Sequence, residues 1–365
     1  MGYFRLLLAF FVVAQHLAGA KFLGSSAVQA FFIVSGFLMT SVMSKTYGYS
    51  AAGFSKFWLN RVLRLYPAYL LIILMTVTVL LSFGETFTRS VAPTIGWPSD
   101  LFEWAQNVTM LFANPVPISV TPRLSPPTWA LTLELVCYFL ISIGLTRTRT
   151  ITWIWITLGS IFLIWALFFS HNARLWGYGS IPSAFLPFAL GGLLFHYQAS
   201  IMDGNAINGS PRLLQKISGQ PALRLLILSL IAIVFLVGVR TVVWKLTSSH
   251  IASMIVYVSS MVPAFFAVIA ALQWKSENPH LKRFDKLAGD LFYPVYLCHW
   301  GIAVAVSGCF QQILGDTLYR GPLLFVLSSA VIVLFSMAVV FAIDRPINRL
   351  RDRVRPGNGS IVEKQ

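Results

Sequence analysis

Apolar stretches long enough to cross a lipid bilayer recur along the whole chain. A transmembrane helix needs about 20 consecutive, mostly apolar residues, because the hydrocarbon core of a bilayer is about 30 Å thick. We predict ten such helices, at residues 3–20, 27–43, 66–83, 128–145, 151–170, 181–197, 222–239, 254–273, 289–309 and 322–343. The chain is therefore expected to be an all-α, polytopic integral membrane protein.

Composition excludes a soluble globular protein. Of the 365 residues, 57% are hydrophobic and 11% are charged, whereas a soluble domain carries about 25% charged residues. The predicted helices leave no stretch large enough for a separate soluble domain. We therefore expect one membrane-embedded domain over residues 1–346, followed by a basic cytoplasmic tail over residues 347–365 that is disordered at its end.

The first predicted helix has an alternative interpretation as a cleaved signal peptide. Its apolar run ends in the small residues Ala18, Gly19 and Ala20, which resemble a signal-peptide cleavage site. Gln15 and His16 interrupt the run, however, and cleavage would leave an odd number of helices. A retained helix is the interpretation that we prefer.

The distribution of basic residues predicts the orientation in the membrane. If the N-terminus is cytoplasmic, the opposite side holds Lys21, Arg89, Arg123, Arg174, Arg240, Lys245 and Arg320. The other 20 of the 27 Lys and Arg residues then lie in cytoplasmic segments, as the positive-inside rule requires. Both termini are therefore expected in the cytoplasm, and the net charge of +15 does not indicate a nucleic-acid partner. The longest loop, residues 84–127, is extracytoplasmic in this topology and long enough to form a partial lid.

Four ionisable residues inside predicted helices are candidates for function. Such a residue costs about 2.5 to 3.5 kcal/mol at the centre of a bilayer, so it needs a partner, a cavity or a role. Arg5 and His16 are eleven residues apart, which returns to within about 20° of the same helix face. Glu134 is expected at the depth of His16, in the outer half of the membrane, and the two are candidates for an acid–base pair. His299 is a weaker candidate, because a buried histidine bonded to a tyrosine or a carbonyl explains it equally well.

Arg61 and Arg64 are spaced i, i+3, so both guanidinium groups project from one face at the cytoplasmic end of the third predicted helix. Two such groups can hold a phosphate bidentately, although anionic lipid headgroups are an alternative partner. Cys137, Cys298 and Cys309 show no metal-ligand spacing. We expect no metal site.

Several motifs occur in a fixed order along nearly the whole chain. They are Arg5-x10-His16, the segment AVQAFFIVSGFL at 27–38, the Arg-x-x-Arg segment FWLNRVLRLYP at 57–67, TWALTLE at 128–134 with Tyr138, the segment YPVYLCHW at 293–300, and Asp344-Arg345-Pro346. In this order they resemble the acyltransferase 3 family of membrane O-acyltransferases, which includes polysaccharide O-acetylases. The chain departs from the family pattern at Gln29, Ala130 and Asp344, where Asp, Ser and Glu are common.

The resemblance implies transfer of an acyl group, most often acetyl, from cytoplasmic acyl-CoA to a sugar hydroxyl of an extracytoplasmic polysaccharide or of its lipid-linked precursor. The expected location is the inner membrane of a bacterium. Acetyl-CoA serves as the donor, and no permanently bound cofactor is expected. The expected partners are acyl-CoA, the glycan and membrane lipids, with other polysaccharide-assembly proteins as further candidates and no nucleic acid.

The resemblance also assigns roles to particular residues. Arg61, Arg64 and Arg5 bind the phosphates of acyl-CoA, and His16 acts as general base on the acceptor hydroxyl or carries the acyl group briefly. Glu134 orients His16 or stabilises its imidazolium. Residues of the second tier are His299, Tyr296, Trp129 and Ser35.

A secondary transporter or a flippase for lipid-linked glycans is the competing hypothesis. Such proteins also have many transmembrane helices and a few buried charges. The two classes differ in one measurable property. An acyltransferase releases free thiol from acetyl-CoA when the acceptor is supplied, and a transporter does not.

Overall fold

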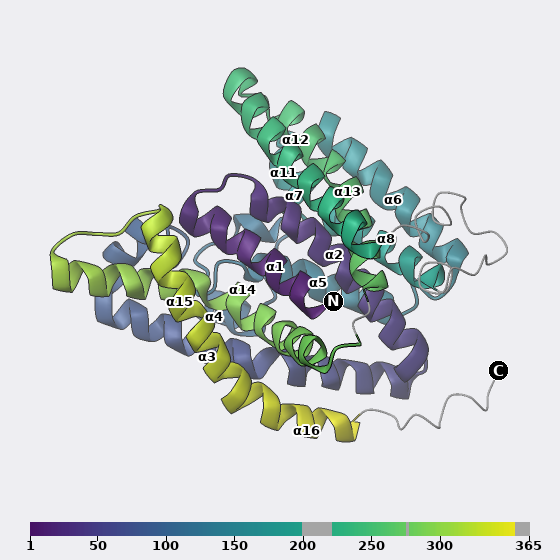
Figure 1. Ribbon diagram of the computed structural model, residues 1–365, viewed down its shortest axis with the longest axis horizontal. Helices are drawn as coiled ribbons and strands as arrows, with labels where there is room; N and C mark the ends of the chain where they lie inside the picture. Colours follow the sequence, from purple (N-terminus) through teal and green to yellow (C-terminus); the bar gives the residue numbers. More distant parts are fainter. Residues whose placement is uncertain (199–220, 275–276, 355–365) are drawn as a thin grey trace.

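The computed structural model describes residues 1–198, 221–274 and 277–354, and the regular elements in these ranges are all helices. Figure 1 shows α6, α8, α11, α12 and α13 on one side of the molecule and α3, α14, α15 and α16 on the other. Between these groups lie α1, α2 and α5. The central position of α1 and α2 brings the motifs of the N-terminal segment into contact with both groups.

The helices follow the predicted order. They are α1 (Gly2–Val13) with the π-helical turn η1 (Ala14–Ala18), α2 (Leu23–Val42) with η2 (Met43–Tyr47), α3 (Ala51–Val91), α4 (Leu101–Thr109), η3 (Pro117–Ser119), α5 (Thr128–Ser142), α6 (Arg149–Phe168), α7 (Ala173–Tyr178), η4 (Ile181–Ala184), α8 (Phe185–His196), α11 (Ala222–Thr247), α12 (His250–Ser259), α13 (Met261–Gln273), α14 (Pro279–Leu314), α15 (Pro322–Val339), η5 (Val340–Asp344) and α16 (Arg345–Val354). Each of the ten segments predicted to cross the membrane is helical. In the tail, 347–354 belong to α16, and residues 355–365 lie outside the described ranges.

Seven helices are long and apolar enough to cross a membrane, among the residues that the structure describes. Three further predicted spans correspond to shorter apolar helices, at Gly2–Ala18, Thr128–Ser142 and Ile181–His196. The multi-pass, all-helical class is therefore confirmed. The number of ten crossings stays a prediction.

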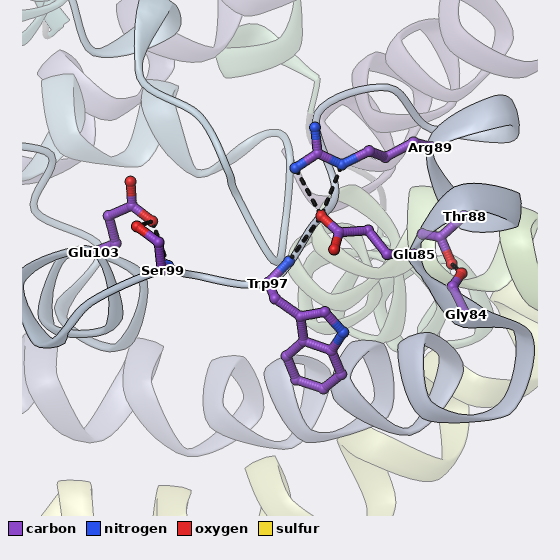
Figure 2. Close-up of polar contacts among 7 residues, drawn as sticks. All are labelled: Gly84, Glu85, Thr88, Arg89, Trp97, Ser99 and Glu103. Atoms are coloured by element: carbon purple, nitrogen blue, oxygen red, sulfur yellow. Dashed lines mark hydrogen bonds and ion pairs between the residues drawn. The ribbon is translucent and has the colours of Figure 1, made fainter.

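The third predicted span is part of a much longer helix, α3, which bends near its end. Gly84 has φ 75° and ψ 160°, a conformation that is essentially restricted to glycine. Figure 2 shows how this bend is held: Arg89 bonds the Glu85 carboxylate at 2.7 Å, and the backbone N–H of Trp97 donates to the same oxygen at 3.4 Å. The chain is thereby turned back toward the molecule after α3 ends.

The segment after α3, which the sequence predicts to be long enough for a partial lid, descends along α3 in the structure. The Tyr66 hydroxyl donates to the carbonyl of Thr109 at 2.6 Å, and the Tyr69 hydroxyl donates to the carbonyl of Asn107. Tyr66 is two residues beyond Arg64, so the C-terminal end of α4 lies near the part of α3 that carries Arg64. The Tyr69 bond satisfies a carbonyl that would otherwise be unpaired inside the protein.

Helix α5 consequently begins deep in the molecule. The Ser125 hydroxyl donates to the carbonyl of Leu297 at 3.0 Å, and the Tyr296 hydroxyl donates to the carbonyl of Pro127 at 3.4 Å. These bonds join the start of α5 to the middle of α14. Because α5 runs from this level toward the end of the bundle that carries Arg64, Glu134 lies about 9 Å further in that direction.

Arg123 holds together the loop before α5. Its guanidinium donates to the carbonyls of Ile118 and Pro126 at 2.9 and 3.0 Å. Burial lowers the pKa of Arg123 to about 10, while the nearby phenol of Tyr296 acts in the opposite direction. The side chain stays protonated at neutral pH, so its donors remain available to these carbonyls.

Two glycines let α2 and α8 approach closely. A Cβ atom on Gly36 would lie 2.1 Å from the carbonyl oxygen of Phe188, and one on Gly191 would lie 2.1 Å from that of Ile33. Small residues at a helix interface permit this close backbone contact in membrane proteins. The contact fixes the position of α2, and with it the position of Ser35, the residue before Gly36.

Candidate active site

A narrow cavity of about 90 Å³ collects most of the residues that the sequence singles out. It lies between α1, α2, α3, α5 and α14, and we call it the Glu134 cavity. Its polar lining residues are Arg5, Ser35, Arg61, Arg64, Glu134, Tyr138, Tyr293 and Tyr296, and its apolar lining includes Phe31, Phe32, Leu38, Met39, Leu65, Leu131 and Phe292. Residues distant in the sequence thus form one site.

Glu134 is the acidic group of this cavity. Its carboxylate accepts a hydrogen bond from the Ser35 hydroxyl at 2.5 Å and another from the Tyr138 hydroxyl. Tyr138 follows Glu134 by four residues on α5, so both project from one face of the helix. Two donors on one carboxylate oxygen restrict its orientation and explain how a carboxylate is accommodated inside the bundle.

Three guanidinium groups line the same cavity. Arg5 lies over the ring of Phe292, with its central carbon 4.4 Å from the ring centroid. Arg64 forms an ion pair with Asp290 at 3.7 Å, and Arg61 lines the cavity from the preceding turn of α3. The predicted cluster of arginines is therefore present, and it surrounds a space that is open to a ligand.

His16 lies in a second cavity, of about 470 Å³, which we call the His16 cavity. The histidine belongs to η1, a π-helical turn that ends at Gly19 in a left-handed conformation. Turns of this kind are frequent at functional sites. The residues that line the cavity are Gln15, His16, Gly19, Lys21, Phe22, Ser25, Arg174, Tyr178, Arg240, Trp244, His250, Ser253, Met254 and Arg320.

The imidazole of His16 packs on that of His299. The two rings are nearly parallel, 19° apart, with centroids separated by 5.4 Å, and the Trp300 ring is 5.2 Å from His16. The Nδ1 atom of His299 lies 2.7 Å from the carbonyl oxygen of Tyr296, to which it donates. The Nε2 atom is buried and has no hydrogen-bond partner among the described residues, so its lone pair is free in the neutral ring.

Arg5 and His16 both face α14, as expected for residues on one helix face. Arg5 contacts Phe292 and His16 contacts His299. The expected contact between His16 and Glu134 is wrong. Glu134 lines the first cavity and His16 the second, because α5 begins at the middle of α14 and not at the surface of the bundle. His299 is the ionisable residue that contacts His16.

One turn of α14 separates the two cavities. Tyr296 lines the Glu134 cavity, and its ring lies 6.5 Å from that of His299, which in turn packs on His16. Of the other second-tier residues, Ser35 bonds Glu134 and Trp129 packs edge-on against Tyr178, a lining residue of the His16 cavity. The roles predicted for all these residues stay predictions.

The sequence analysis missed the cations of the His16 cavity. Lys21, Arg174, Arg240 and Arg320 line it. The sequence analysis had counted them only as basic residues on the extracytoplasmic side. A signal was present for Arg240, because apolar residues continue beyond it as far as Trp244. The helix indeed extends to residue 247 and includes this arginine.

A family model described as an acyltransferase domain matches residues 1–343 of the chain. Comparison with curated proteins and comparison with solved structures gave no match. The matched range includes α1 to α15 and every residue that lines either cavity. Both cavities therefore belong to the part of the chain that the family shares.

Proposed function

The chain belongs to the acyltransferase 3 family and is a membrane acyltransferase, and from this membership we propose that it is an O-acetyltransferase. The donor is acetyl-CoA on the cytoplasmic side. The acceptor is a sugar hydroxyl of an extracytoplasmic polysaccharide or of its lipid-linked precursor, at the inner membrane of a bacterium. No permanently bound cofactor takes part.

The observation that carries the proposal is a pair of cavities linked by side-chain contacts through one turn of α14, from Tyr296 to His299 to His16. One contains three guanidinium groups and the other contains His16. A transfer across a membrane needs two such compartments, one for each substrate, with the reacting atoms near their boundary. Between the two cavities, Tyr296 of the first contacts His299, which packs on His16 of the second.

In the proposed donor site, Arg61, Arg64 and Arg5 hold the phosphates of acetyl-CoA. Guanidinium groups bind phosphate oxygens in pairs of parallel hydrogen bonds. The pantetheine arm is a thin, flexible chain, which suits the narrow and largely apolar Glu134 cavity. Its thioester end points toward Tyr296 and reaches past it during transfer.

In the proposed reaction, His16 removes the proton from the acceptor hydroxyl. The oxygen attacks the thioester carbonyl carbon, the carbon–sulfur bond breaks, and the departing CoA thiolate receives the proton from the imidazolium. His299 packs on His16 and holds the ring in place. Glu134 acts in the donor cavity, where Ser35 and Tyr138 orient its carboxylate.

The proposed direction requires both termini in the cytoplasm. The common cytoplasmic location of the basic segments is supported by two contacts near the N-terminal part of α3: Arg351 of α16 bonds Asn60 at 3.1 Å, and Arg64 pairs with Asp290 in the N-terminal half of α14. We expect a reporter fused after Arg149 to read as cytoplasmic and one fused after Thr94 to read as extracytoplasmic. The opposite readings would exchange the donor and acceptor sides and refute the mechanism.

Purified protein in nanodiscs provides the direct test of function. With acetyl-CoA and an extract of surface glycan, we expect free thiol to appear and the glycan to gain acetyl esters, detected by NMR. Glycan whose hydroxyls have been chemically blocked is the control and should release no more thiol than buffer. Transport of the glycan across vesicles without any thiol release would instead identify a transporter or flippase.

A further inference from the structure

The His16 cavity has a strongly positive wall. Of the seven basic residues that the topology assigns to the extracytoplasmic side, four line this cavity: Lys21, Arg174, Arg240 and Arg320. No Asp or Glu is among its lining residues. The cations come from four separate parts of the chain, so their convergence is a property of the fold and not of a local charged segment.

Arg240 is the most deeply placed of these cations, with 5% of its surface exposed. Its Nε and Nη1 atoms donate to the hydroxyls of Ser253 and Ser25 at 3.1 and 2.8 Å. Its guanidinium carbon lies 4.1 Å from the ring centroid of Phe22 and 4.9 Å from that of Tyr257. The side chain is therefore held rigidly at the wall of the cavity.

The charge of Arg240 is not paired with any carboxylate of the residues that the structure describes. Hydroxyls and aromatic faces attract a guanidinium but do not neutralise it. Phe22 adopts a positive φ of 67° at the turn where its ring meets Arg240, an unfavourable conformation for a non-glycine residue. A buried charge kept under these conditions indicates a site for an anion.

Aromatic side chains provide the rest of a sugar site. Trp244, Tyr178 and Phe22 line the cavity, and its volume of about 470 Å³ is in the range of small-molecule sites. From these observations we infer that the acceptor is an anionic glycan, with a carboxylate or phosphate bound by Arg240 and the three exposed cations of the cavity while a hydroxyl of the same unit faces His16. This inference rests on the proposed function and names the chemical class of its acceptor.

Three small probes test the inference on the full-length protein in phosphatidylcholine nanodiscs. They are methyl glucuronoside, with a carboxylate, glucose 1-phosphate, with a phosphate, and the neutral methyl glucoside. Binding is measured by calorimetry without acetyl-CoA, and acetyl transfer is measured separately as kcat/KM. We expect at least one charged probe to bind about tenfold more tightly than methyl glucoside. The better charged probe distinguishes a uronic acid from a sugar phosphate.

Substitutions of the cations test whether the preference for a charged probe arises in the His16 cavity. Arg240→Gln should weaken binding of the preferred charged probe by about ten- to a hundredfold, the value of one charge-assisted hydrogen bond, and leave methyl glucoside unchanged. Arg320→Gln, at an exposed loop position, and Arg174→Gln, at an exposed position of the short helix α7, should reduce the same preference without affecting folding. Arg89→Gln is the matched control, because Arg89 is paired with Glu85 outside the cavity (Figure 2).

The outcomes separate this inference from the proposed function. Equal binding of charged and neutral probes would overturn the anionic acceptor even if acetyl transfer is measured. The same holds if Arg240→Gln and Arg320→Gln weaken the binding of charged and neutral probes by the same factor. Competition by phosphatidylglycerol together with no binding of either charged sugar would assign the cations to lipid and also overturn it. Charge-selective binding without any thiol release would support the anion site and refute the acetyltransferase.

Discussion

Replacing His16 with alanine is expected to reduce acetyl transfer by about 10² to 10⁴, the usual contribution of a general base. The residue faces the larger cavity and packs on His299, in the turn of α14 that lies between this cavity and the donor site. Acetyl-CoA binds elsewhere in the proposed mechanism. Its affinity, measured by calorimetry on the purified variant, should stay within about twofold of the wild-type value.

A second variant distinguishes the loss of the proton acceptor of His16 from the loss of its packing contacts. His16→Phe keeps an aromatic ring against His299 and Trp300 but has no proton acceptor, so it should be as inactive as His16→Ala. His171→Ala, at an exposed position in the loop before α7, is the matched control and should keep full activity. If His16→Phe restored the wild-type rate, the role of His16 would be packing, and His299 would be the next candidate base.

Removing both Arg61 and Arg64 is expected to weaken acetyl-CoA binding by about 10² to 10⁴. Each charge-assisted hydrogen bond contributes about 1.5 to 3 kcal/mol, and about 1.4 kcal/mol corresponds to tenfold in affinity. Acetyl-pantetheine carries the thioester but no CoA phosphates. The double alanine variant should therefore use acetyl-pantetheine as well as wild type does, while losing the preference for acetyl-CoA.

Matched substitutions control for charge and for folding. Arg224→Ala removes an exposed arginine at the start of α11, on the same predicted side of the membrane, and should leave both donors unaffected. Lysine at positions 61 and 64 keeps the charge but not the paired geometry, so an intermediate affinity is expected. An equal loss with acetyl-CoA and acetyl-pantetheine would mean that the arginines serve the structure or bind lipid headgroups.

Hydropathy predicted the helices well because each must bury its backbone polar groups within the segment itself. Hydropathy could not predict how far a helix continues beyond its apolar segment. Helix α3 begins at Ala51, fifteen residues before the predicted span, and bends at Gly84. The descent of the segment after α3 depends on bonds from Tyr66 and Tyr69 to carbonyls about 40 residues later, and no local pattern encodes such contacts.

Features of the site that depend on the geometry of one helix could be predicted from the sequence. Contacts between two helices could not. The spacing of Arg5 and His16 defined a common face, and both residues do face α14. The predicted contact of Glu134 with His16 was wrong because the prediction placed the start of α5 at the surface of the bundle. In the structure this start is bonded to the middle of α14. Arg240 was missed because the predicted span ended at residue 239, whereas the helix continues to Thr247.

The contacts between α1 and α14 also determine when the protein can become active during synthesis. His16 emerges from the ribosome among the first residues, yet its ring partner His299 follows nearly 300 residues later. The start of α5 is likewise bonded to a carbonyl 172 residues further along the chain, and α5 has only 15 residues, too few for the usual span of about 20. His16 and Ser125 therefore lack these partners until α14 has been inserted. Neither cavity is complete on a nascent chain, and acylation begins only after nearly the entire polypeptide has been inserted.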